Sequence, residues 1–89
     1  MAHSSEDFDH PWLIERIPEE VLARYRRAMF RVRSSNEPLV ILDALREMQD
    51  ILKQIERAAV EEARAQGATW PQVAEALNRT RQAVEQRFG

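Results

Sequence analysis

The sequence predicts an all-α protein built from an amphipathic helix, a long central helix and a pair of short C-terminal helices. Apolar residues recur at steps of three and four over most of the chain, which is the spacing of one helix face. Residues that start and stop helices separate these periodic stretches. With 2 glycines and 4 prolines among 89 residues, there is little room for long loops. A chain of this length forms one small domain with a marginal core.

The first 17 residues are expected to form an acidic tail that ends in a short anchoring turn. Residues 1–20 carry a net charge of −5, and the stretch up to Asp9 has no apolar periodicity. A helical turn is expected to start at Pro11 and to place Trp12 and Ile14 against the rest of the protein. Residues 18–89 are then predicted to form a single helical domain.

Residues 18–34 are predicted to form an arginine-rich amphipathic helix. Pro18 suits a first helical turn, and Glu19 and Glu20 then lie at the positive end of the helix dipole. One face of this helix is apolar and comprises Val21, Leu22, Tyr25, Ala28, Met29 and Val32. Phe30 points away from that face, among the arginines Arg24, Arg26, Arg27, Arg31 and Arg33. This Arg24–Arg33 block could follow a phosphate backbone, pair with the acidic tail or a second subunit, or bind a protein partner.

Residues 36–66 are predicted to form one long helix, with Asn36 as its N-cap and Gly67 as its left-handed C-cap. An apolar seam with alternating steps of four and three runs along it through Ile41, Leu45, Met48, Leu52, Ile55 and Ala59. At 1.5 Å per residue, about 29 residues give a rod of roughly 43 Å, which exceeds the roughly 30 Å diameter of a compact domain of this size.

A rod of this length needs more cover than one helix provides. The first helix and the C-terminal helices can each cover a part of it, or a second copy of the chain can cover a part. The chain has no cysteine, so disulfides cannot supplement a small core. We therefore expect a homodimer through the N-terminal and long helices, with a monomer that has a thick local core as the alternative. The predicted dimer or core seam comprises Leu39, Ile41, Leu42, Leu45, Met48, Leu52 and Ile55.

Residues 69–89 contain two short helices with strong cap signals. Thr69 and Gln72 have the spacing of a capping box, and this helix is expected to end at Leu77. Asn78 tolerates the positive φ of a tight turn between helices, and Thr80 can cap a last helix over residues 81–88. This spacing predicts a helix-turn-helix motif. Its core residues are expected to be Trp70, Val73, Ala74, Leu77, Asn78, Val84 and Phe88.

Residues 66–88 read QGATWPQVAEALNRTRQAVEQRF and resemble the helix-turn-helix of small bacterial DNA-binding proteins, especially those of actinobacteria. Such proteins commonly have a long helix, then Gly-Ala-Ser/Thr-Trp, a Leu-Gly turn, Ser/Thr-Arg-Gln-Ala and a terminal Arg-Phe. The resemblance is strongest over residues 56–88. The chain departs from it at the turn, where Asn78 replaces glycine and Arg79 stands where an apolar residue is usual. The resemblance implies that the last helix lies in the major groove of DNA.

Projected as a helix, residues 81–88 turn Val84 and Phe88 inward and Gln82 and Gln86 outward. Glutamine can pair bidentately with adenine and arginine with guanine, so the candidates for base reading are Gln82, Gln86 and Arg81. The candidates for contacts along the DNA backbone are Thr69, Arg79, Thr80 and the small Ala83, which lets the helix lie close to the groove wall.

The preferred hypothesis is a transcriptional regulator that binds specific double-stranded DNA. The alternative is a helix-turn-helix interaction adaptor that binds another regulator or a polymerase subunit. The formal net charge of −2 and Glu85 beside the reading face count against DNA. However, the acidic residues concentrate in the tail and the long helix, whereas residues 67–89 carry a net charge of +1.

Other classes of function are not expected. No stretch of 18 apolar residues and no signal-peptide pattern occurs, which favours a cytoplasmic protein with no membrane partner. A metal site formed by His3, Asp7, Asp9 and His10 is not expected, because nothing in a tail would fix the geometry of the ligands. No serine has a positioned base and no glycine-rich phosphate loop occurs, so neither an enzyme nor a cofactor is expected.

Overall fold

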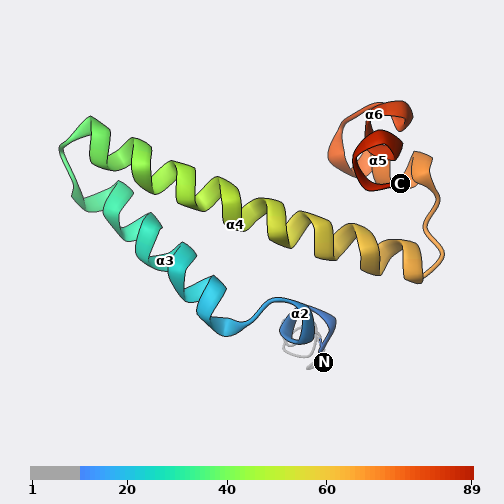
Figure 1. Ribbon diagram of the computed structural model, residues 1–89, viewed down its shortest axis with the longest axis horizontal. Coiled ribbons are helices and arrows are strands. Elements are labelled where there is room, and N and C mark those ends of the chain that lie inside the picture. Colours follow the sequence, from blue (N-terminus) through green and yellow to red (C-terminus); the bar gives the residue numbers. More distant parts are fainter. Residues whose placement is uncertain (1–10) are drawn as a thin grey trace, which may run out of the picture. The chain divides into compact units, whose positions relative to one another are not determined.

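A computed structural model describes residues 11–89, with the side chains of residues 11, 13 and 14 excepted. The described residues are all-α and contain no strand, as predicted (Figure 1). The helices are α2 (Pro11–Arg16), α3 (Glu19–Ser34), α4 (Pro38–Ala65), α5 (Trp70–Leu77) and α6 (Arg81–Phe88). None of them is long and apolar enough to cross a membrane. The predicted tail up to His10 lies outside the described residues.

The chain divides within α4 into two compact units, Met1–Ile55 and Glu56–Gly89. In the first unit, α3 runs antiparallel to the first half of α4 (Figure 1). Ala28, Ala44 and Met48 form the buried centre of this pair, with Tyr25, Val32 and Leu45 packed around it. Ala28 and Ala44 are 1% and 0% exposed, and such small side chains let two helices approach closely. Each unit has its own core, and the single domain stays a prediction.

The helix starts differ from those predicted by one or two residues. Pro18 occupies the N-cap position of α3 rather than its first turn. The prediction of Asn36 as the N-cap of α4 is wrong. The chain stays non-helical one residue further, and the Glu37 carbonyl accepts the first α-helical hydrogen bond, from the Ile41 N–H at 3.1 Å. The side-chain oxygen at this helix start belongs to Ser35, which accepts the Glu37 N–H at 3.0 Å.

The buried face of α4 is centred at a different position around the helix from the predicted seam. Ala44, Met48 and Ile51 are buried there, and Ile51 was not among the predicted seam residues. Of the predicted seam only Met48 is buried, whereas Ile41, Leu45 and Ile55 are half-buried. The remaining predicted members are exposed, at 79% for Leu39, 59% for Leu42 and 49% for Leu52. The centre shifts because α3 presents the small Ala28, against which Ala44 packs.

In the second unit, the end of α4 packs with α5 and α6 around a separate core. Val60, Val73, Ala74 and Val84 are buried in it. The partly buried apolar residues around this cluster are Ala68, Trp70, Leu77 and Phe88. All apolar members of the predicted C-terminal core therefore lie in one cluster.

Gly67 ends α4 as predicted. Its φ of +98° lies in the left-handed region that favours glycine. The Gly67 N–H donates to the Arg64 carbonyl at 3.0 Å, and the Ala68 N–H donates to the Ala63 carbonyl at 2.9 Å. This pair of bonds is a Schellman motif, which satisfies the last carbonyls of the helix and sets the direction in which the chain leaves it.

Candidate functional site

The start of α5 is fixed by a capping box. The Thr69 hydroxyl accepts the Gln72 N–H at 3.3 Å, and the Gln72 side-chain oxygen accepts the Thr69 N–H at 2.8 Å. Arg64 adds a second restraint, because its guanidinium lies 4.1 Å from the centre of the Trp70 ring and donates to the Ala68 carbonyl at 2.9 Å. The direction of α5 after Gly67 is therefore held by local contacts.

The turn between α5 and α6 repeats the geometry at the end of α4. Asn78 has a φ of 55° and a ψ of 47°. Its N–H donates to the Glu75 carbonyl at 3.1 Å, and the Arg79 N–H donates to the Ala74 carbonyl at 2.9 Å. These bonds form a second Schellman motif. The Thr80 hydroxyl then accepts the Ala83 N–H at 3.1 Å and caps α6, as predicted.

Helix α6 has one packed side and one exposed side, as the helical projection predicts. Val84 is 1% exposed and Phe88 is half-buried. Gln82, Ala83 and Gln86 are exposed. The predicted backbone-contact residues Thr69, Arg79 and Thr80 are exposed as well. The exposed side of α6 therefore offers amide and hydroxyl groups, while the opposite side packs in the core and holds the helix in place.

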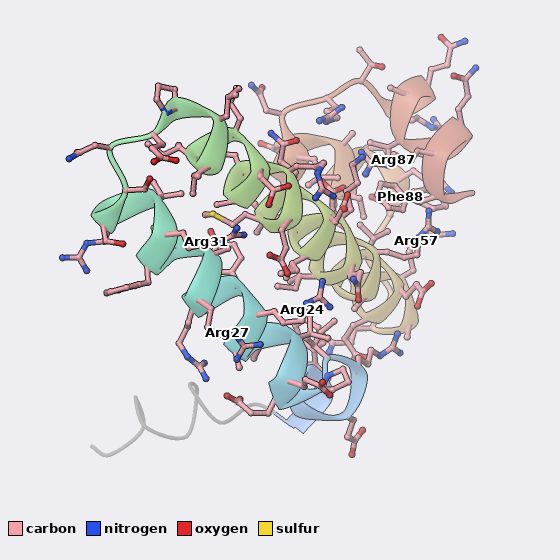
Figure 2. The ribbon with its side chains drawn as sticks, turned by 60° about the vertical axis from the view of Figure 1, so that its left-hand side comes forward. Arg24, Arg27, Arg31, Arg57, Arg87 and Phe88 are labelled. Carbon is pink, nitrogen blue, oxygen red and sulfur yellow. The ribbon has the colours of Figure 1, made fainter. Side chains whose placement is uncertain are left out.

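Two of the three arginines near this surface are engaged within the protein. Arg81, a predicted base-reading residue, forms an ion pair with Glu85 one turn along α6. Arg87 forms an ion pair with Glu56 at 2.8 Å and lies with Arg57 beside the Phe88 ring (Figure 2). The spacing of four residues could have indicated the Arg81–Glu85 pair. No local pattern indicates the pair between Arg87 and Glu56, which are far apart in the sequence.

Arg79 is the remaining cation of this segment. It is exposed, and no carboxylate lies within ion-pair distance of it in the described part of the chain. The net charge of +1 in residues 67–89 thus overstates the positive charge of this surface. Glu56 of α4 lies outside that range and neutralises Arg87.

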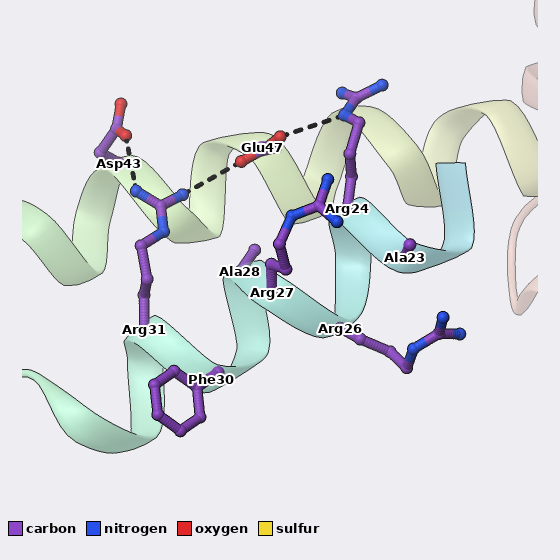
Figure 3. Close-up of a pocket in the computed structure, with 9 residues that line it drawn as sticks. All are labelled: Ala23, Arg24, Arg26, Arg27, Ala28, Phe30, Arg31, Asp43 and Glu47. Atoms are coloured by element: carbon purple, nitrogen blue, oxygen red, sulfur yellow. Dashed lines mark hydrogen bonds and ion pairs between the residues drawn. The ribbon is translucent and has the colours of Figure 1, made fainter. Parts of the chain in front are cut away.

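A second candidate surface lies in the first unit, where a groove of about 720 Å³ runs between α3 and α4 (Figure 3). Arg24 and Arg31 donate to the two oxygens of Glu47, at 3.2 and 3.0 Å, and Arg31 also donates to Asp43 at 3.2 Å. Arg27 lies between them without an ion pair among the described residues. The groove is lined by Ala23, Arg24, Arg26, Arg27, Ala28, Phe30, Arg31, Asp43 and Glu47.

The opposite side of the α3–α4 pair is apolar. A groove of about 410 Å³ is lined there by Leu22, Tyr25, Arg26, Leu52 and Ile55. Arg26 is its single charged residue and donates to Glu19 on its own helix at 2.6 Å.

No group of three acidic or histidine side chains that could hold a metal ion occurs in residues 11–89. The residues of the metal site that the sequence disfavours, His3, Asp7, Asp9 and His10, lie outside the described residues. No protein-family model matches the chain, and no curated protein or solved structure shows significant similarity to it.

Proposed function

We propose that the protein binds specific double-stranded DNA as a transcriptional regulator. In this proposal α5 and α6 act as a helix-turn-helix, and α6 enters the major groove. The observation that carries the proposal is that α6 has one buried side and one exposed side. Val84 anchors it in the core while Gln82 and Gln86 are exposed on a helix whose direction is held by the turn at Asn78. The resemblance of residues 66–88 to actinobacterial helix-turn-helix proteins supports the same function.

The exposed groups divide into base-reading and phosphate-binding roles. Gln82 and Gln86 present amide groups that match the N6 and N7 atoms of adenine. Arg81 keeps N–H groups for a guanine or a phosphate even when its Nε donates to Glu85. Thr69, Thr80 and the unpaired Arg79 are suited to phosphates, which fix the position of the helix without reading the sequence. Ala83 leaves room for a close approach to the groove wall.

A double substitution tests the reading residues. Each bidentate contact contributes about 1 to 3 kcal/mol of discrimination between bases. We therefore expect Gln82→Ala with Gln86→Ala to lose most sequence preference in selection from a random duplex pool, while non-specific binding remains. Selection at two salt concentrations separates the two effects, because phosphate contacts weaken steeply with salt. The matched control is Gln54→Ala with Gln66→Ala, two exposed glutamines of the α4 region. A double variant that selects the same sequences as the wild type would overturn the assignment.

The proposal includes a homodimer. Residues 67–89 carry a net charge of only +1, so one copy gains little from phosphate attraction. Two copies would present two α6 helices, and on one face of a duplex their half-sites would lie about 34 Å apart. Spacing of the selected half-sites by one helical turn would support this arrangement.

A second candidate function is a protein-interaction adaptor, favoured by the arginine-lined groove of Figure 3. Arg27 has no ion pair there and Phe30 is 66% exposed, so this part of the Arg24–Arg33 helix offers a cation and an aromatic ring to a protein partner. Absence of salt-dependent duplex binding, together with a purified partner whose binding is lost in Arg27→Ala with Phe30→Ser, would favour the adaptor over the regulator.

A further inference from the structure

We propose that the first unit pairs with a second copy through the apolar side of α3 and α4, in an antiparallel arrangement. This apolar side comprises Leu22, Tyr25 and Met29 of α3 and Leu45, Leu52 and Ile55 of α4. The inference rests on the proposed homodimer but is independent of DNA binding. It adds the face that is used, the orientation of the two copies and the residues that meet across the two-fold axis.

The two sides of the α3–α4 pair differ in chemistry. One side carries the ion pairs of Arg24 and Arg31 with Glu47 (Figure 3). On the other side, the three α3 members fall within about 60° of the helix circumference and the three α4 members within about 80°, at 100° per residue. The groove lined by Leu22, Tyr25, Leu52 and Ile55 establishes that these residues of the two helices face the same space.

Helix α4 carries two neighbouring apolar seams, and α3 covers one of them. The first seam, Ala44, Met48 and Ile51, is buried. The second seam lies one step around the helix and contains the half-buried Leu45 and the 49% exposed Leu52. A helix that is apolar over such a wide arc packs between two other helices, as in a four-helix bundle. Helix α3 therefore leaves Leu52 of the second seam exposed.

A second copy fits this surface better than a charged partner. Arg26, the single charged residue in the groove, is already paired with Glu19, so no free charge selects an acidic or basic ligand. The 16 residues of α3 are about 24 Å long, and two packed helices are about 20 Å wide. Two such faces together bury roughly 1,000 Å², which is the size at which specific interfaces begin.

The positions of groove and protruding side chains favour an antiparallel pair. In a two-fold symmetric interface, the protrusion of each copy meets the groove of the other. Met29 on α3 and Leu42 at the edge of the apolar side of α4 do not line the groove; both are exposed and lie near the turn between the helices. Leu22 and Leu52 line the groove farther from that turn. Antiparallel pairing places Met29 over the partner's Leu22 and Leu42 over the partner's Leu52.

The contacts expected for α3 and for α4 place the two-fold axis at the same distance from the turn between the helices. The midpoint between Leu22 and Met29 on α3 lies about nine residues, or about 14 Å, from the turn at residues 35–37. The midpoint between Leu42 and Leu52 on α4 lies about as far from the same turn. A single axis therefore satisfies both helix pairs.

Cysteine cross-linking tests the arrangement, because the natural chain has no cysteine. We expect a mixture of Met29→Cys and Leu22→Cys proteins to form a mixed disulfide on mild oxidation. In a dimer the effective thiol concentration is millimolar, so the disulfide should form on the order of a thousandfold faster than in the same reaction between micromolar monomers. Either variant alone should form little disulfide, since two copies of the same position lie about 10 Å apart along the helices, beyond the roughly 7 Å reach of a disulfide.

The matched control uses the same seven-residue spacing on the other side of α3, where Ala23 and Phe30 line the arginine groove. A mixture of Ala23→Cys and Phe30→Cys should not cross-link above the rate of monomers. Faster cross-linking of Met29→Cys with itself than in the mixture would overturn the antiparallel orientation. Cross-linking of the Ala23 and Phe30 pair would overturn the choice of face.

Charge insertion gives a second test. Leu52→Asp should convert the dimer to a monomer in light scattering at micromolar concentration, with helix content retained. Leu39→Asp is the control, because Leu39 is 79% exposed and lies away from the apolar side. A wild-type monomer across the micromolar range would remove the inference. A wild-type dimer that binds no duplex would instead leave the interface intact and remove the proposed DNA-binding function.

Discussion

Asp43 illustrates how single side chains set the charge pattern of the first unit. Its two oxygens accept hydrogen bonds from Arg46 at 2.8 Å and from Arg31 at 3.2 Å. The hydrogen bond from Arg46, followed by that from Arg31, holds the pKa of Asp43 below its ordinary value. The same contact raises the pKa of Arg46. Because Asp43 is exposed, this cluster orients the arginines more than it stabilises the fold.

We expect a pH dependence that follows from this lowered pKa. A carboxylate whose folded-state pKa is depressed contributes stability above its unfolded pKa of about 3.9, and this contribution is lost as the pH falls through the folded value. Titration of the Asp43 carboxyl carbon by NMR should therefore show a midpoint below about 3.9. In Arg46→Ala the midpoint should rise towards the ordinary value. Titration of the wild type at or above the ordinary value would contradict the hydrogen bonds to the carboxylate.

Lengths and caps of the C-terminal helices could be predicted from the sequence because their signals are local. Thr69, Gly67 and Asn78 act on groups within a few residues, so the spacing alone located α5 and α6. The outward positions of Gln82 and Gln86 followed from helical periodicity. Whether these residues read DNA is a property of a complex, and it stays a prediction.

The centre of the contact between α3 and α4 could not be predicted in this way. A seam centred on Ile51 and one centred on Leu52 both have the four-three spacing. The choice depends on which residues α3 presents, and the small Ala28 against Ala44 decides it. The pair between Arg87 and Glu56 is likewise set by the packing of α6 near the end of α4 rather than by a local pattern.

The left-handed backbone conformation of Asn78, in the turn between α5 and α6, leads to a prediction about stability. A non-glycine residue in the left-handed region costs about 1 to 2 kcal/mol, which asparagine partly avoids. We expect Asn78→Ala to lower the free energy of unfolding by about 1 kcal/mol, whereas Asn78→Gly should lower it little or not at all. Urea unfolding followed by circular dichroism measures both. Equal stability of the alanine and glycine variants would contradict the φ of 55°.

The whole molecule has small cores and a considerable exposed apolar area. Ile51 and Val84 are the largest fully buried side chains among the described residues. In contrast, Phe30, Leu39, Leu42 and Leu52 are all about half exposed or more. A chain of 89 residues buries a smaller fraction of its surface than a larger domain does. Burial of the apolar side in a dimer would therefore be a large part of the total stability.

Because the cores are small and much apolar area is exposed, we expect the thermal stability of the protein to depend on its concentration. If folding is coupled to association, a tenfold increase in concentration adds about 1.4 kcal/mol per dimer. For a dimer of two such chains, about 2 to 4 °C per kcal/mol gives a rise in Tm of roughly 3 to 6 °C. Scanning calorimetry at two concentrations measures the rise. Leu52→Asp should lower Tm and abolish its dependence on concentration, since the charge prevents association, whereas Leu39→Asp should keep it. A wild-type Tm that is the same at both concentrations would mean that each unit folds without the second copy.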